Sequence, residues 1–215
     1  MLAGQTAVYQ GNEVCLFPLP YVNCTQGNGT STYSHCCGTM SDWAGPTAQM
    51  AYYAPFSCTR YSGPSGSDNY TFYVSDHKVW TPSGLQWVGF VVMHDDHPPA
   101  ATHYNQGDLI GHTGTAGFVT GDHVHLDQAF TQTPSLADSG MTCAGSGTRC
   151  WYVPGGVQPD RCYYLTGDET IVSQGQFNIP VYDGSVTPGG DGDGNLLWFI
   201  LGLAAGRNKR RGGGS

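Results

Sequence analysis

Short apolar and aromatic runs, separated by turns rich in glycine, proline, serine and asparagine, dominate the first 130 residues of the chain. The run LQWVGFVVMHDD at 85–96 has the strongest strand pattern, because it is rich in β-branched and aromatic residues. Further strands are predicted within 50–63, where the segment GPSGS at 63–67 should form the closing turn, and within 69–76. A short strand and a polar turn at 14–33 lead to His35. The pattern therefore predicts a mostly β protein.

The next segment, 104–130, alternates glycine turns with short strands. Four closely spaced glycines exclude a helix here: Gly111, Gly114, Gly117 and Gly121. A glycine-rich phosphate loop is not favoured, because no lysine follows the glycines and no helix begins after them.

The net charge of the chain argues against one class of partner. The net charge is −8, and half of the eight basic residues are Arg207, Lys209, Arg210 and Arg211, close to the C-terminal end. The remaining chain is strongly acidic and would repel a phosphate backbone, so we expect no nucleic-acid partner.

Eight cysteines in a chain poor in lysine favour disulfide bonds and an oxidising destination, such as the cell exterior or a virion. Reduced, buried cysteines are the alternative. Cys36 and Cys37 are adjacent in sequence, and a bond between neighbours is strained, so each would need a distant partner. The pairing itself stays open.

The C-terminal part has a different composition. A glycine- and aspartate-rich linker is expected at 181–195, followed at 196–215 by a short apolar segment and a basic tail. The apolar run has about ten residues, half of what a membrane-spanning helix needs, so we expect no transmembrane helix. The first residues lack the basic and apolar stretches of a secretory signal, and we therefore expect another carrier to deliver the protein.

The strongest chemical signal is the His-x-His pair in TGDHVHLDQAF at 120–130. On a strand, residues two apart face the same side, so His123, His125 and Asp127 would share one face. Two convergent imidazoles suit a zinc site. An isolated His-x-His pair is more often two histidines on an exposed sheet face than a metal site. The surrounding sequence decides between these two interpretations.

The segment QGDLIGHTGTAGFVTGDHVHLD at 106–127 resembles the signature of the lysostaphin/LytM-type zinc endopeptidases, in which a glycine-rich run leads to the His-x-His pair. The upstream segment YSHCCGTMSDWAG supplies a histidine and an aspartate, and YYAPFSC resembles the strand that follows the aspartate in that family. His35 and Asp42 are seven residues apart instead of the usual four. This longer gap, and the segment that precedes it, resemble the branch found in bacteriophage tail-tip proteins.

The resemblance implies that His35, Asp42 and His125 are zinc ligands and that a fourth coordination position stays open, as in catalytic zinc sites. It implies that His123 is a general base and that a further histidine stabilises the oxyanion. We assign the latter role to His94, with His97 as the alternative. Asp122 or Asp127 is a candidate for orienting an imidazole, and the alternative for either is a solvated carboxylate in a turn.

The resemblance also implies an antiparallel sheet with a zinc groove flanked by loops. The expected peptidase domain covers 1–180, with a core at about 15–130 and an irregular cysteine-containing elaboration at 131–180. The predicted function is hydrolysis of cross-link or stem peptides of bacterial peptidoglycan, by a phage tail or other virion-associated or extracellular lysin whose partners are virion subunits.

Two alternatives stay open. The chain could be a structural or host-binding tail component that keeps the peptidase fold without turnover. It could also be a cysteine hydrolase that uses Cys36 or Cys37 with His123, although this acidic stretch does not favour a reactive thiolate.

Overall fold

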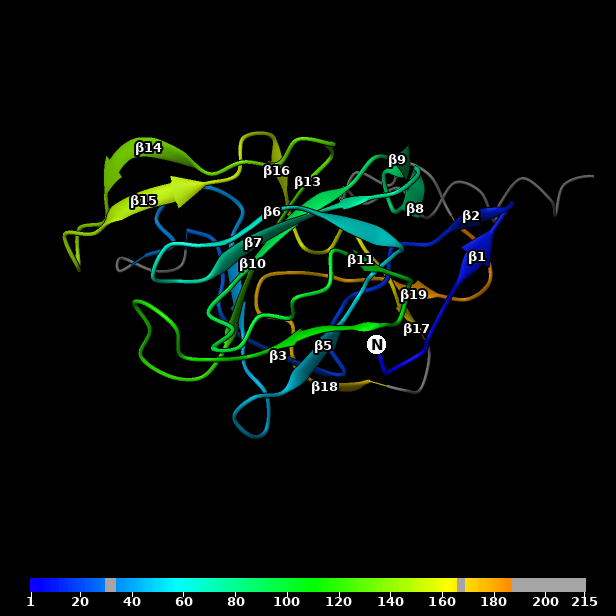
Figure 1. Ribbon diagram of the computed structural model, residues 1–215, viewed down its shortest axis with the longest axis horizontal. Helices are drawn as coiled ribbons and strands as arrows, with labels where there is room; N and C mark the ends of the chain where they lie inside the picture. The colour runs from blue at the N-terminus through cyan, green and yellow to red at the C-terminus, as the bar shows by residue number, and fades with distance from the viewer. Residues whose placement is uncertain (30–33, 166–168, 187–215) are drawn as a thin grey trace, which may run out of the picture.

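The computed structural model describes residues 1–29, 34–165 and 169–186. The described residues form strands and turns and contain no helix. A nine-stranded sheet dominates, and all but one of its strand pairs are antiparallel. The predicted mostly β, antiparallel fold is confirmed (Figure 1). No described helix has the length and apolar character needed to cross a membrane.

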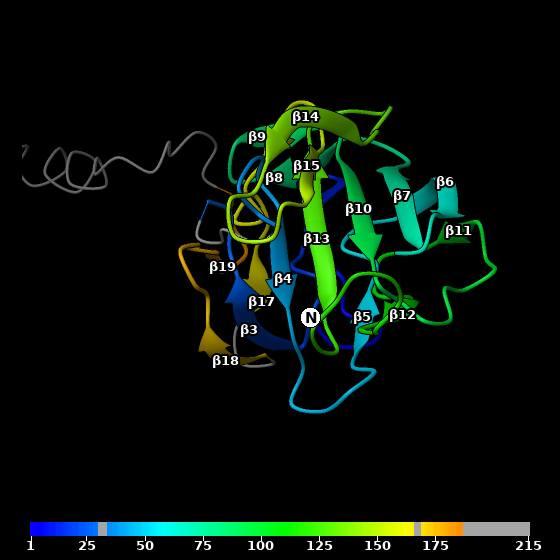
Figure 2. The ribbon, with the colours of Figure 1, turned by 90° about the vertical axis from the view of Figure 1, so that its left-hand side faces the viewer.

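Along the main sheet, the strands follow in the order β11 (His103–Tyr104), β6 (Cys58–Ser65), β7 (Tyr70–Ser75), β10 (Gly89–Met93), β13 (Val124–Ala129), β4 (Ser41–Trp43), β3 (Tyr21–Gln26) and β18 (Thr170–Ser173). A short strand, β16 (Gly156–Val157), pairs with the end of β13. Strand β13 thus lies in the middle of the sheet, between β10 and β4 (Figure 2).

Within the described residues there are also five two-stranded sheets: β1 (Val8–Tyr9) with β2 (Asn12–Glu13), β5 (Ala51–Tyr53) with β12 (Leu109–His112), β8 (Val79–Thr81) with β9 (Gly84–Gln86), β14 (Ala137–Thr142) with β15 (Arg149–Tyr152), and β17 (Tyr164–Leu165) with β19 (Val181–Tyr182).

The hydrophobic core fixes which side of β13 carries the polar residues. Val124 and Leu126 belong to the main core cluster, together with Trp43 and Phe90 on the neighbouring strands. Because side chains alternate along a strand, His125 and Asp127 face the opposite side. A one-residue slip of β13 would bury the histidine in the apolar core, so the core pattern specifies this register.

The predicted turn at 63–67 is wrong. Strand β6 continues through Gly63 and Pro64, which are joined by a cis peptide bond, and the turn lies at 66–69. The pairing of β6 with β7 shifts register on both sides of Ser62, and such irregular places are where a sheet tolerates proline.

The cysteine-containing elaboration packs onto the main sheet at several points. Disulfides join Cys36 to Cys143 and Cys37 to Cys150, so each of the adjacent cysteines has a distant partner, as predicted. These bonds fasten the β14–β15 hairpin, which projects at one end of the molecule (Figure 1). The other four cysteines are thiols.

The predicted linker begins with residues that are part of the fold, because Val181 and Tyr182 form β19. The apolar segment and basic tail at 196–215, and the rest of the linker from 187, lie outside the described residues.

Candidate metal centre

The structure brings Asp42 and His125 together by strand pairing. They lie directly opposite each other on β4 and β13, and Nδ1 of His125 is 3.1 Å from Oδ1 of Asp42. Cross-strand neighbours of this kind have adjacent Cβ atoms, so the register of the sheet alone places the two side chains in contact.

His35 reaches the same carboxylate from the loop before β4. Its Nε2 lies 3.3 Å from Oδ1 of Asp42, and its ring packs edge-on against the ring of His125 at a centroid distance of 4.9 Å. The backbone beyond His35 is held by the two disulfides at Cys36 and Cys37. The seven-residue gap between His35 and Asp42 thus accommodates a disulfide-bonded loop and still delivers the imidazole to the carboxylate.

The donor atoms of His35, Asp42 and His125 fit a zinc ion. All three lie within 4.8 Å of one another, and all three residues are buried. At zinc–ligand distances of about 2.0–2.2 Å, two ligands of a tetrahedral ion lie about 3.4 Å apart, close to the two separations observed here, 3.1 and 3.3 Å. The buried Nδ1 of His35 has no hydrogen-bond partner in the described structure.

Electrostatics favour the ionised form of Asp42, which is the form that can bind a metal ion. Burial on its own raises the pKa of this carboxyl group, but the hydrogen bonds and charges of His125 and His35 outweigh burial and hold the pKa well below its usual range. Burial lowers the pKa of His35, which keeps that imidazole neutral. The pKa of His125 is raised, because the contact with Asp42 outweighs the opposing effect of burial.

His123 lies beside this centre, immediately before β13. Its backbone pairs with Gly114 in an isolated bridge that continues the alternation of β13, so its side chain stays on the same face as His125. Nδ1 is 2.8 Å from the carbonyl of Gly121 and must donate a proton to it. In the neutral ring, Nε2 is therefore the unprotonated nitrogen, and it lies 3.6 Å from Oδ1 of Asp42.

His94 completes a row of histidines. It follows β10 with a φ of +79°, an uncommon backbone conformation for a residue other than glycine, and its ring centroid is 4.7 Å from that of His123. Its Nδ1 donates to the carbonyl of Ala116 over 2.8 Å. Burial, reinforced by the nearby His125, lowers the pKa of His94 to about 4. His97, the alternative, is exposed, and its amide donates to Asp95.

Gly114 explains part of the glycine-rich signature. A Cβ atom there would lie 2.2 Å from the carbonyl oxygen of His94 and 2.8 Å from the amide nitrogen of Asp96. Glycine is thus required where the loop at 113–123 passes between His94 and His123. The loop lies beside the lower end of β13 in Figure 2, and the β14–β15 hairpin lies above it.

The two expected orienting carboxylates bind other groups. Asp122 accepts hydrogen bonds from the Gln49 amide and the Thr113 hydroxyl, so it fastens the loop. Asp127 is buried two residues beyond His125 and accepts from the Thr39 hydroxyl at 2.7 Å and the amides of Gln128 and Val153. The described contacts do not support the expectation that either carboxylate bonds an imidazole.

Sequence reasoning missed two residues that shape the site. Thr39 ties the loop after His35 to Asp127. The backbone carbonyl of Asp68 accepts a hydrogen bond from the His94 amide, and its carboxylate accepts one from the Phe118 amide. Both act through contacts distant in sequence, and the local sequence around them carries no signal for either.

No protein-family model matches the chain. In sequence it is 32% identical over 121 residues to morphogenesis protein 1 of Bacillus phage B103, a match that covers 54% of this chain and 32% of that protein. The chain thus spans about a third of the length of this relative.

Among solved structures, the chain is similar to the catalytic domain of the antimicrobial peptidase lysostaphin from Staphylococcus simulans, at 14% identity and a TM-score of 0.41, over 52% of this chain and 84% of that one. The chain resembles the lysostaphin-type peptidases. A zinc-containing peptidase from Vibrio cholerae is similar at 16% identity and a TM-score of 0.40, over 55% of this chain and 38% of that one.

Proposed function

We propose that this protein is a zinc-dependent endopeptidase that hydrolyses cross-link or stem peptides of bacterial peptidoglycan. The observation that carries the proposal is a buried set of two imidazoles and one carboxylate, with a further imidazole of fixed tautomer beside it. Three protein ligands leave a coordination position open, which is typical of catalytic zinc sites and not of structural ones.

In this proposal His35, Asp42 and His125 hold the zinc ion. When bound there, zinc supplies Lewis-acid polarisation of the scissile carbonyl and makes water acidic enough to ionise near neutral pH. His123 is the general base. Because Gly121 fixes the proton on Nδ1, Nε2 is free to take a proton from the attacking water and return it to the leaving amine.

His94 stabilises negative charge. Its bond to Ala116 also fixes the proton on Nδ1, so the neutral ring has no proton on Nε2 to donate. Nε2 must first take a proton from bulk solvent as negative charge develops on the carbonyl oxygen, and it returns this proton to solvent when the oxyanion collapses. The low pKa of about 4 ensures that the resting ring is uncharged and does not repel the metal ion.

The peptidoglycan substrate is proposed because the segment at 106–127 resembles the signature of the lysostaphin/LytM-type endopeptidases. The virion setting is supported by the similarity to a phage morphogenesis protein. We propose that the protein acts as part of a phage tail or another virion, or in the extracellular space, with virion subunits as partners. The strongly acidic chain is unsuited to binding nucleic acid.

Digestion of purified bacterial cell walls tests the proposal. The wild type should release new amino groups, and a zinc chelator should abolish this release. His123→Ala and His94→Ala should each lower turnover by about 10²–10⁴-fold and still bind zinc. His97→Ala is the matched control for His94→Ala and should retain wild-type activity.

Two results would overturn the proposal. If the wild type binds zinc but leaves cell walls of every tested peptide chemistry intact, the structural or host-binding alternative is favoured. If activity survives the chelator and is lost on thiol alkylation, the protein is a cysteine hydrolase. The structure disfavours the latter, because Cys36 and Cys37 are both in disulfides and carry no thiolate.

A further inference from the structure

Two of the four thiols lie opposite each other on neighbouring chain segments. The amide of Tyr163 donates to the carbonyl of Cys15 at 2.9 Å, and the amide of Phe17 donates to the carbonyl of Tyr163 at 2.8 Å. This is a parallel bridge between Leu16 and Tyr163, so Cys15 and Cys162, one residue earlier on each segment, are also opposite. Neighbouring strands are about 4.8 Å apart, which sets the separation of these two Cα atoms at about 5 Å.

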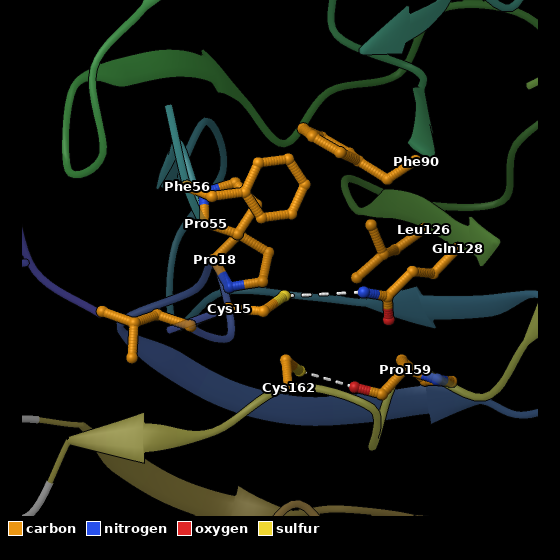
Figure 3. Close-up of a pocket in the computed structure, with 10 residues that line it drawn as sticks. Cys15, Pro18, Pro55, Phe56, Phe90, Leu126, Gln128, Pro159 and Cys162 are labelled. Atoms are coloured by element: carbon orange, nitrogen blue, oxygen red, sulfur yellow. Dashed lines mark hydrogen bonds between the residues drawn. The ribbon is translucent and has the colours of Figure 1, made fainter. Parts of the chain in front are cut away.

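The two side chains also point to the same side. Leu16 and Tyr163 pack together in a small cluster, whereas Cys15 and Cys162 belong to the main core. Figure 3 shows both thiols in one small, largely apolar recess that they line together with Phe56 and Leu126. Cys15 accepts a hydrogen bond from Gln128 at 3.5 Å, and Cys162 donates to the carbonyl of Pro159 at 2.6 Å.

We infer that Cys15 and Cys162 form a third disulfide bond in the protein folded under oxidising conditions. The expected Cα separation is within the range of about 4.4–6.8 Å that disulfides require, and the two Cβ atoms are on one side of the paired segments. A rotation of the side chains about the Cα–Cβ bonds brings the sulfur atoms toward each other and exchanges the weak contacts to Gln128 and Pro159 for an S–S bond.

The bond forms by thiol–disulfide exchange with a disulfide oxidant, the same chemistry that forms the bonds at Cys36 and Cys37. The thiolate of one cysteine attacks the oxidant, and the second thiolate displaces the oxidant's thiol from the mixed disulfide. Two protein thiols are oxidised and the oxidant is reduced to two thiols. Burial raises the pKa of both cysteines, so exchange takes place during folding, before the recess closes.

The remaining thiols are placed elsewhere. Cys24 is on β3 and Cys58 is on β6, at well-separated positions in the order of the main sheet. A bond between Cys15 and Cys162 would fasten the far end of the elaboration, whose near end is already held by Cys143 and Cys150. The elaboration would then be cross-linked on both sides of β16, which pairs with β13.

Peptide mapping tests the inference directly. The chain is refolded in a mixture of reduced and oxidised glutathione, unfolded in guanidinium with iodoacetamide but no reductant, digested, and analysed by mass spectrometry. We expect alkylation at Cys24 and Cys58 only, and one cross-linked peptide that contains Cys15 and Cys162. Alkylation of Cys15 and Cys162 to the same extent as Cys58, in chains with the other two disulfides intact, would overturn the inference.

Single variants provide an independent readout. Cys15→Ser and Cys162→Ser should each release the partner as a third alkylated thiol, whereas Cys58→Ser should release none. Cys15→Ser and Cys162→Ser should also lower the thermal midpoint relative to the wild type when no reductant is present. With reductant present, the difference from the wild type should be much smaller. An equal loss under both conditions would mean that only the buried thiol matters and would contradict the cross-link.

Discussion

The stabilisation that each of the two disulfides beside His35 gives to the fold should depend on whether the other disulfide is present. Cys36–Cys143 and Cys37–Cys150 each close a loop of more than a hundred residues, with sequence separations of 107 and 113. In the chain-entropy treatment, one such loop lowers the entropy of the unfolded chain enough to stabilise the fold by about 5 kcal/mol.

The second bond adds less, because the two loops share most of their residues. Once either bond exists, the other closes a ring of only about ten residues through 36–37 and 143–150, worth about 3 kcal/mol. Removing one pair, as Cys36→Ser with Cys143→Ser, should therefore lower the free energy of unfolding by about 3 kcal/mol. Removing both pairs should lower it by about 8 kcal/mol, more than twice as much.

Denaturant unfolding of the two double variants and the quadruple variant measures these values. Each variant is also unfolded in the presence of reductant, which gives the cost of the serine substitutions alone, and this cost is subtracted. If the loss for the quadruple variant equals the sum of the two double-variant losses, the nested-loop reasoning is wrong. Zinc affinity should fall along the same series, because the bonds hold the backbone next to His35.

Two further predictions concern the loops around the site. Gly114→Ala should destabilise the protein by about 1–3 kcal/mol and sharply reduce cell-wall digestion, because its Cβ would collide with the backbone of His94 and Asp96. Gly121→Ala is the control for stability, because the added Cβ meets open space, and it should stay within about 0.5 kcal/mol of the wild type. An equal loss of stability in the two variants would refute this. Thr39→Val should lower the free energy of unfolding by about 1–3 kcal/mol, measured with denaturant, because buried Asp127 loses a hydrogen bond. The control Thr133→Val, at an exposed position, should stay within about 0.5 kcal/mol of the wild type. A loss for Thr133→Val as large as that for Thr39→Val would contradict the role given to the Thr39–Asp127 hydrogen bond.

The β class could be predicted from the pattern of apolar and turn residues. The convergence of His35, Asp42 and His125 was predicted from the resemblance to the lysostaphin/LytM-type endopeptidases, and the structure brings these three side chains together. The position of Gly114 shows why the signature is informative: the glycine is needed where the loop passes the backbone of His94.

Other features depend on contacts between distant segments and could not be read from local patterns. The GPSGS segment has the composition of a turn, but pairing with β7 keeps it within a strand. Asp127 has the spacing of an orienting carboxylate, yet Thr39 and Val153 occupy its oxygens. The disulfide partners of Cys36 and Cys37 could not be predicted either, because the hairpin that brings Cys143 and Cys150 to them has no distinctive sequence pattern.

Zinc content tests the central claim most directly. The chain, purified without an added histidine tag and saturated with zinc, is passed through a desalting column and its metal measured by mass spectrometry, alongside His35→Ala, Asp42→Asn and His125→Ala. His77→Ala, at a half-exposed histidine paired with Glu13, is the control. We predict one zinc per chain in the wild type and the control, and a loss of affinity of more than about a hundredfold in the three ligand variants. A wild type that retains no zinc, or ligand variants that retain as much as His77→Ala, would contradict the account.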